Sequence, residues 1–232
     1  MIFILSNKIE NIENIENIKT ITVTPEYIKK TLKFNDSEVL QINIKYPDIK
    51  INTADKFEKK INNFYSSIVK SFIKYCEKIL YKNAAYQKDS DGFKPFGAVI
   101  TFETAYNGRD CLCIYLDINI YAGKGRGNAV RKAHIWEYKG GGLVNPKKMI
   151  QFSRPLKSKI CEYICNTMTR QIENGEEYYT KCDLVSVYKY LNMRNFYLND
   201  KGYSFFFPQN TVAPHESGIV SVIVPEKIVS GG

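Results

Sequence analysis

The chain has 232 residues, 44% of them hydrophobic, which is enough for one domain or two small ones with an adequate core. Its formal net charge of +9 favours anionic partners such as nucleic acid, an anionic glycopolymer or an acidic membrane surface, although the lysines are scattered and form no dense basic run. The first five residues are too short for a signal peptide, and no later stretch approaches a membrane span. We therefore expect a soluble, cytoplasmic chain as it stands, with an extracytoplasmic location as the alternative if a leader or anchor is missing.

The first 19 residues contain the triplet Ile-Glu-Asn repeated over positions 9–18. A period of three residues drifts around an α-helix and cannot form a straight buried stripe, so residues 1–19 are expected to be a variable tail. Residues 20–232 are expected to form a single domain. Within it, residues 19–24 and 38–46 read as strands, with a helical turn over 25–32.

The longest helix is predicted over residues 53–81, where apolar side chains recur at steps of three and four. Thr53 is a suitable N-cap, and proline is absent throughout. A polar loop over 82–94 is expected to lead into a strand over 96–106. Asn107-Gly108 then predicts a hairpin turn into the next strand.

The fold is expected to be organised around residues 110–138, two strands joined by a glycine turn. Alternation in the first strand buries Leu112, Ile114 and Leu116, and leaves a polar face that carries Cys111, Cys113, Tyr115, Asp117, Asn119 and Tyr121. The glycine turn over 123–127 is followed by a returning strand, which places Lys132, His134, Trp136 and Tyr138 on one side.

The second half of the chain alternates helices with a strand-rich end. Asn145-Pro146 and Pro155 mark helix starts, and Asp183 is a candidate cap for a helix through Leu191. Strands over 196–199 and 202–207 flank a strong hairpin turn signal, and a last strand covers 218–224. The pattern predicts an α+β fold, with an antiparallel sheet packed against one long helix and several shorter ones.

Chemical motifs in the sequence are few. The six cysteines, the pairs Cys111/Cys113 and Cys161/Cys165 included, lack the usual zinc spacing, so free thiols and no metal or other cofactor are expected. Only two histidines exist, and no nucleophile-elbow or cysteine-protease signature accompanies them. We therefore expect no enzyme activity. The single tryptophan, Trp136, is a candidate for the core or for an interface.

Two segments resemble a known family, the RsiV-type anti-sigma factors, in their extracytoplasmic domain. The first runs from Tyr121-Ala-Gly123 through Gly127-Asn128-Ala-Val-Arg131-Lys132 to Leu143–Ile150, and the second from Phe196 to Gly202, continuing to Phe207, Ala213-Pro214, Gly218 and Pro225. A similar module precedes the catalytic domain of PdaC-type polysaccharide deacetylases. The resemblance covers about 38–229. The histidine usual in the family's hairpin is replaced here, with Arg126 at or beside its place.

The resemblance implies a non-enzymatic sensing or binding domain. In RsiV-type proteins this domain recognises lysozyme and controls the release of a sigma factor. A protein or a cell-envelope ligand is thus the expected partner, and nucleic acid a minor one. The alternatives from other classes are an envelope-glycan hydrolase or esterase using His134 with Asp117, and a cytoplasmic regulator bound to nucleic acid. The expected binding surface is the polar face of the central hairpin: Tyr115, Asp117, Asn119, Tyr121, Lys124, Arg126, His134 and Trp136.

Overall fold

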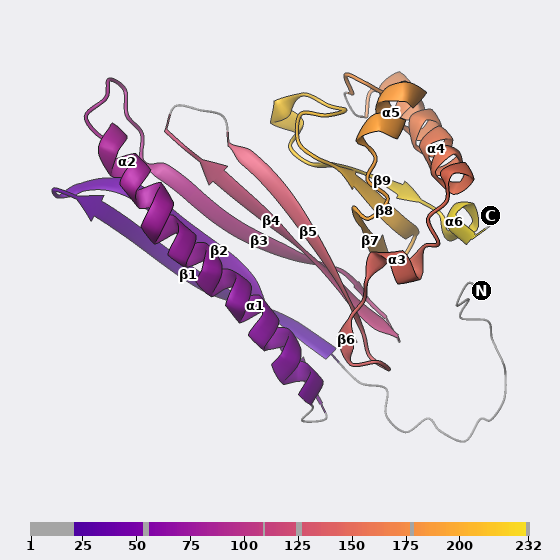
Figure 1. Ribbon diagram of the computed structural model, residues 1–232, viewed down its shortest axis with the longest axis horizontal. Helices are drawn as coiled ribbons and strands as arrows, with labels where there is room; N and C mark the ends of the chain where they lie inside the picture. The colour runs from indigo at the N-terminus through magenta and orange to yellow at the C-terminus, as the bar shows by residue number, and fades with distance from the viewer. Residues whose placement is uncertain (1–20, 53–55, 109, 124–126, 177–178, 231–232) are drawn as a thin grey trace. The chain divides into compact units, whose positions relative to one another are not determined.

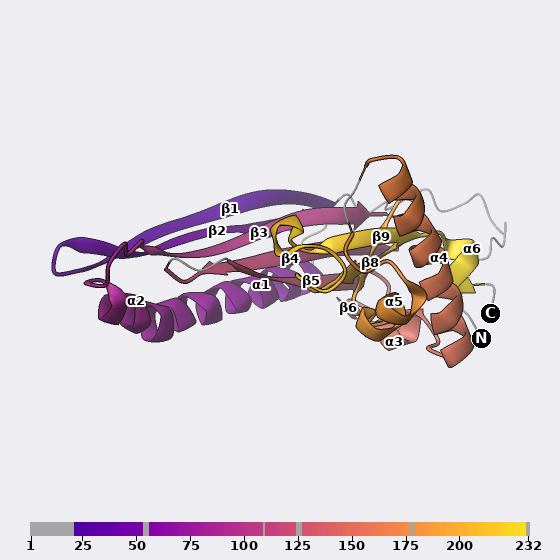
Figure 2. The same cartoon turned by 90° about the horizontal axis from the view of Figure 1, so that it is seen from above.

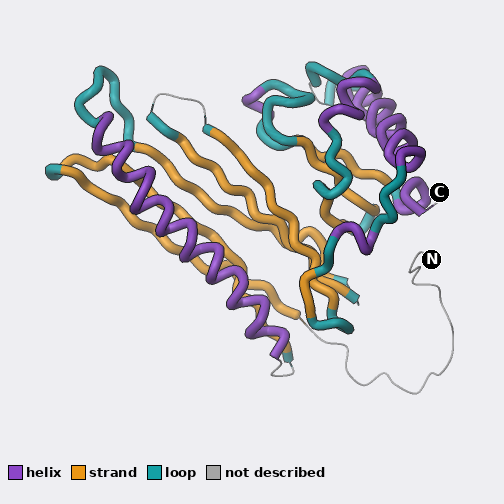
Figure 3. Tube along the Cα trace, in the orientation of Figure 1, coloured by secondary structure: helices purple, strands orange, loops and turns teal. Residues whose placement is uncertain are grey.

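The computed structural model describes residues 21–52, 56–108, 110–123, 127–176 and 179–230 (Figure 1). The expected tail over 1–19 and the predicted cap Thr53 lie outside these residues. Runs of strands are followed by runs of helices along the described chain, as the colours of Figure 3 show. In chain order they are β1 (Ile21–Phe34), β2 (Ser37–Ile51), α1 (Lys56–Tyr75), η1 (Cys76–Leu80), α2 (Tyr81–Gln87), β3 (Phe96–Asn107), β4 (Cys111–Tyr121), β5 (Asn128–Glu137), β6 (Gly142–Leu143), α3 (Pro146–Met149), α4 (Arg154–Glu173), α5 (Leu184–Tyr190), β7 (Phe196–Asn199), β8 (Gly202–Phe207), η2 (His215–Ser217), β9 (Val220–Val224) and α6 (Glu226–Ser230).

The fold is α+β, as predicted. Strands β1 to β6 follow one another in a single sheet, and β7 to β9 form a second, smaller sheet. The chain divides into two compact units. We call Thr20–Glu103 with Leu116–Lys132 the long-helix unit, and Thr104–Tyr115 with Ala133–Gly232 the small-sheet unit. The expectation of a single domain over 20–232 stays a prediction.

A long β-hairpin opens the long-helix unit. Strands β1 and β2 pair antiparallel from Ile21↔Ile51 to Phe34↔Ser37, and the turn uses Asn35 and Asp36 at φ of 47° and 62°. The helical turn predicted over 25–32 is therefore wrong. Pro25 is tolerated because β1 is an edge strand, where a residue without an N–H group loses no ladder bond on the open side.

The sheet of this unit is mixed rather than purely antiparallel. Strand β2 pairs parallel with β3, from Leu40↔Phe96 to Ile44↔Ile100. A parallel connection requires a crossover, and the long helix supplies it. Figure 2 shows α1 and α2 running along one face of the strands in this unit.

The long helix covers Lys56–Gln87, six residues past the end that the polar sequence after Tyr81 predicts. Its buried side chains mostly recur every four residues: Phe57, Ile61, Tyr65, Val69, Phe72, Cys76, Leu80 and Ala84. A strict four-residue step drifts around an α-helix of 3.6 residues per turn. The wider π-turns of η1 accommodate that step, so Leu80 and Ala84 still face the sheet.

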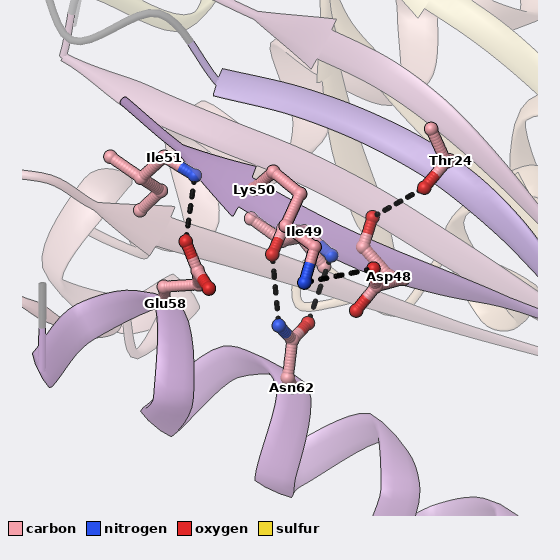
Figure 4. Close-up of polar contacts among 7 residues, drawn as sticks. All are labelled: Thr24, Asp48, Ile49, Lys50, Ile51, Glu58 and Asn62. Atoms are coloured by element: carbon pink, nitrogen blue, oxygen red, sulfur yellow. Dashed lines mark hydrogen bonds and ion pairs between the residues drawn. The ribbon is translucent and has the colours of Figure 1, made fainter. Parts of the chain in front are cut away.

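Polar side chains also attach this helix to β2 (Figure 4). The Asn62 amide accepts from the N–H of Ile49 and donates to its C=O, both at 2.9 Å, and Glu58 accepts from the N–H of Ile51 at 2.8 Å. These positions lie beyond Leu40–Ile44, the part of β2 that pairs with β3. The helix thus supplies partners to strand groups that the β3 ladder does not reach.

The small-sheet unit agrees closely with the sequence analysis. Asn145 caps α3, Ser153 caps α4 just ahead of Pro155, and Asp183 caps α5. Strands β7 and β8 have the predicted bounds, whereas α6 was not predicted. The core of this unit gathers buried side chains from α4, α5 and β7–β9, together with Cys113 of β4 and Ile135 of β5.

Candidate functional site

An ion pair defines which side chains of β4 and β5 share a face. The Arg131 guanidinium donates from Nε and Nη2 to the two carboxylate oxygens of Asp117, both at 2.7 Å. Since side chains alternate along a strand, Asn119 and Tyr121 lie on the same face as Asp117. The pair is largely sequestered, because the exposed fractions of its side chains are 10% for Arg131 and 22% for Asp117.

Tyr121 extends this face over two glycines. A Cβ atom at Gly97 would lie 3.2 Å from Cδ2 of Tyr121, and one at Gly127 would lie only 2.3 Å from Cε1. The ring therefore rests close to the backbone at both positions, and Gly127 must lack a side chain for it to do so. The side chain remains 47% exposed, which leaves the ring available for stacking.

The same face continues across the neighbouring strands. Gly97 is paired with Gln41 of β2, and Asn43 lies two positions further along, opposite Val99. Gln41 and Asn43 are both exposed, while the intervening Ile42 is buried on the other side. Long-helix-unit residues thus form one surface, which we call the polar sheet face: Gln41, Asn43, Asp117, Asn119, Tyr121 and Arg131.

The structure divides the binding surface predicted from the sequence. Asp117, Asn119 and Tyr121 belong to the polar sheet face, and Lys124 and Arg126 lie outside the described residues. Tyr115 continues the same face of β4 into the small-sheet unit, where its ring centroid lies 4.7 Å from that of Tyr197. His134 and Trp136 belong elsewhere.

The alternation along β5 places His134 and Trp136 on the face opposite to Arg131. Trp136 is only 1% exposed, so it is a core residue and not an interface anchor. The expectation that both lie on the same face as Tyr115 and Asp117 is wrong, because that face carries the odd-numbered residues of β5 and not the even-numbered ones. For the same reason, the structure does not bring His134 together with Asp117, whose carboxylate is bound to Arg131.

Gln41, Asn43 and Arg131 were missed in the sequence analysis. The parallel pairing of β2 with β3 brings the first two to the face, and no local pattern marks a parallel pair separated by a long helix. Arg131 was quoted only within the family resemblance. The available signal was that Asp117 and Arg131 carry opposite charges on the two strands that flank the glycine turn, where they can form a cross-strand ion pair.

Four of the six cysteines are poor nucleophiles. Burial raises the pKa of Cys113 to about 12 and the pKa of Cys76, Cys111 and Cys161 to about 11. All four are therefore protonated thiols at neutral pH. No disulfide joins the cysteines, and within the described ranges no three His, Cys, Asp or Glu side chains are grouped to hold a metal ion.

A second polar cluster lies in the small-sheet unit, around Tyr138. Its hydroxyl lies 3.0 Å from Oδ1 of Asn107, and its backbone N–H donates to the carbonyl of Asp110 at 2.9 Å. Burial is the main cause that raises the pKa of Tyr138, and the negative charges that Cys111, Tyr106 and Asp110 carry when they are ionised raise it further. The phenol is therefore a neutral hydrogen-bonding group that fixes the hairpin end.

Comparison with known proteins matches two family models to successive parts of the chain. The model described as deacetylase PdaC matches residues 34–129, and the model described as a protein of unknown function, DUF3298, matches residues 148–227. The chain thus pairs a PdaC-type domain with a DUF3298 domain. The polar sheet face lies in the PdaC-type domain, apart from Arg131, which follows the matched segment by two positions.

Solved structures share the fold of this PdaC/DUF3298 chain. A DUF3298-family protein from Bacteroides fragilis has a TM-score of 0.68 at 13% identity, and one from Pseudomonas aeruginosa has a TM-score of 0.57 at 10% identity. Each similarity covers 93% of this chain and 94% of the other. No curated protein gives a significant match. No helix in the described residues is long and apolar enough to cross a membrane.

Proposed function

We propose that this chain is a non-catalytic binding module, and that the polar sheet face of its PdaC-type domain holds the ligand. The supporting observation is the chemistry of that face. Its two charges neutralise each other, and the remaining groups are side-chain amides and a half-exposed tyrosine ring. Such a surface recognises hydroxyl and amide groups by hydrogen bonds and flat apolar patches by stacking.

Two ligand classes fit this chemistry: a glycan of the cell envelope, and a protein such as lysozyme. The second follows from the resemblance to RsiV-type sensing domains. Lysozyme is itself basic, and this chain, with its net charge of +9, would repel it at long range. The Asp117–Arg131 pair reduces that conflict at the centre of the face, whereas the exposed Lys29, opposite Asn43 on the same side of the sheet, adds a positive charge at its edge.

A hydrolase or esterase that uses His134 with Asp117 is the less favoured reading. The two side chains belong to opposite faces of their strands, and Asp117 is engaged by Arg131. The PdaC family carries the name of a deacetylase, so release of acetate from an acetylated glycan is the activity to measure. We expect none above the rate without protein.

The test is binding of the full chain to two defined probes, purified peptidoglycan and hen lysozyme, by pull-down and calorimetry. We expect one probe to bind, and Tyr121→Ser to weaken that binding at least about tenfold, as loss of a stacking residue does. Tyr188→Ser, at a tyrosine of α5 in the other unit, is the matched control and should bind normally. Binding that survives Tyr121→Ser unchanged would contradict the proposed site, and binding of neither probe would contradict both ligand classes.

A further inference from the structure

The outward face of the long helix is strongly basic. The segment Lys56–Gln87 contains seven lysines and only two acidic residues. After Lys56 at the start of the helix, the other six lysines are all exposed and recur along one side: Lys59, Lys60, Lys70, Lys74, Lys78 and Lys82. The last four follow one another at four-residue steps, which is a spacing of about 6 Å along the helix axis.

Both acidic residues of the helix are already engaged. Glu58 accepts the Ile51 N–H group, and Glu77 pairs with Lys30 of β1. Within the described part of the chain, no ion pair forms at Lys70, Lys74, Lys78 or Lys82. The charge of this row is therefore uncompensated by the protein itself, and it attracts anions.

Large apolar side chains stand beside the lysine row. Tyr75, Ile79 and Tyr86 are all exposed, Ile79 by 49% and Tyr86 by 91%. The tip of the β1–β2 hairpin adds a further ring, Phe34, which is also exposed.

Two contacts fix this hairpin tip beside the end of the helix. The Tyr81 hydroxyl donates to the Lys33 carbonyl at 3.1 Å, and Lys88 Nζ lies 5.9 Å from the centre of the Phe34 ring. One end of the long-helix unit thus presents cations and apolar side chains together.

We propose that this basic outer face docks the protein on an anionic lipid bilayer. Lysines draw a helix to acidic headgroups, and aliphatic or aromatic side chains enter the headgroup boundary beside them. A linear polyanion such as nucleic acid uses the lysines but offers no acyl chains to Ile79. The four-residue row and its apolar neighbours together therefore favour lipid.

Docking in this way orients the unit. The helix covers one side of the sheet (Figure 2). The polar sheet face lies on the other side, because the exposed Gln41 and Asn43 alternate along β2 with the buried Ile42. A bilayer bound by the helix leaves Asn43, Asn119 and Tyr121 directed to the aqueous phase. Membrane docking and the proposed ligand binding are thus separate properties, tested independently.

The experiment is co-sedimentation of the full chain with vesicles of zwitterionic phospholipid alone or with one-third anionic phospholipid. We expect binding only to the anionic vesicles. The triple variant Lys74→Glu, Lys78→Glu and Lys82→Glu should lose at least about tenfold in affinity. The matched control Lys147→Glu, Lys148→Glu and Lys227→Glu has the same net charge, alters exposed lysines of the other unit, and should lose far less.

A second variant, Ile79→Ser with Tyr86→Ser, tests the apolar contribution. Both side chains are exposed, so the fold is retained, which circular dichroism verifies. We expect the serine variant to bind anionic vesicles at low salt and to lose this binding at about 0.3 M salt. At that salt concentration the attraction between lysines and headgroups is screened, and the wild type still binds through its apolar side chains. The lipid proposal would be overturned by equal binding to neutral and anionic vesicles, or by equal losses of affinity in the two charge variants. It would also be overturned, in favour of nucleic acid, if the serine variant bound vesicles as the wild type does and the protein bound polyuridylate tightly.

Discussion

Arg131 and Asp117 form a bidentate ion pair across β4 and β5, with both N–O distances at 2.7 Å. The pair joins the two strands on either side of the glycine turn, and it sets which side chains of the hairpin face each other. It also neutralises the centre of the polar sheet face. Its removal should therefore affect stability and ligand chemistry together.

We expect Arg131→Met to lower the free energy of unfolding by about 1–3 kcal/mol, because it leaves the half-buried Asp117 carboxylate without its two donors. Asp117→Asn should cost less, since an amide oxygen still accepts one bond. Urea denaturation of both single variants and the double variant gives the coupling energy. A coupling near zero would show that the pair has no structural role; Lys132→Met, on the same strand, is the control.

The attachment of the helix to β2 depends on one amide. Asn62→Ala removes both hydrogen bonds to Ile49 and should destabilise the chain by about 1–3 kcal/mol. The exposed neighbour Asn63→Ala should change the stability by less than about 0.5 kcal/mol. Thermal or urea unfolding followed by circular dichroism measures both. Alanine raises the helix propensity at both positions, so similar stabilities of the two variants would mean that the contact of Asn62 with β2 contributes nothing.

Alanine substitutions at two glycines with positive φ distinguish the cost of backbone strain from the cost of a steric clash. At Gly202 (φ +132°) a Cβ atom would lie 2.6 Å from the Val224 carbonyl oxygen, whereas at Gly175 (φ +69°) nothing lies within 4 Å. Gly175→Ala should cost about 1 kcal/mol through strain alone. Gly202→Ala adds a clash with the backbone of the next strand, so we expect a clearly larger loss of unfolding free energy. A smaller loss at Gly202 would contradict the packing of β8 on β9.

The buried thiols predict how stability depends on pH. Their pKa values are raised in the folded state, so the unfolded chain gives up these protons first as the pH rises. The contribution of each thiol to stability is complete below the unfolded pKa of about 9 and is lost as the pH rises through its folded value, which is about 12 for Cys113 and about 11 for Cys76.

We therefore expect the free energy of unfolding, measured with urea under reducing conditions, to fall between about pH 9 and pH 11. Cys113→Val should flatten this dependence by up to one proton, or about 1.4 kcal/mol per pH unit. The readout is the slope, since the substitution also changes packing at every pH. An unaltered slope in Cys113→Val would contradict the burial of this thiol.

Local signals predicted the elements that local chemistry determines. The caps Asn145 and Asp183 and the hairpin from Phe196 to Phe207 were correct, because capping side chains and turn residues act within a few positions. The strand at Pro25 was missed because its pairing with β2 overrides the local preference of the segment. The end of the long helix, after Tyr81, was missed because the burial of Ala84 offsets the polar sequence around it.

The candidate site was half predicted for a related reason. Alternation alone assigned Asp117, Asn119 and Tyr121 to one face of β4. The register of β5 against β4 could not be read from the glycine turn, and a slip of one residue exchanges the two faces of a strand. His134 and Trp136 were therefore assigned to the wrong side, and Arg131 was overlooked. The basic helix face was hidden in the same way, since lysines that are scattered in sequence share one side only once the helix has formed.

The parallel pairing of Leu40 with Phe96 has a kinetic consequence. The β1–β2 hairpin and the helix can each form from contacts between residues close in the chain, whereas β3 reaches β2 only after the whole crossover has been closed. Contacts between such distant residues slow folding. We therefore expect the slow step in the folding of this unit to be the closure that brings β3 to β2, and not the formation of the long helix.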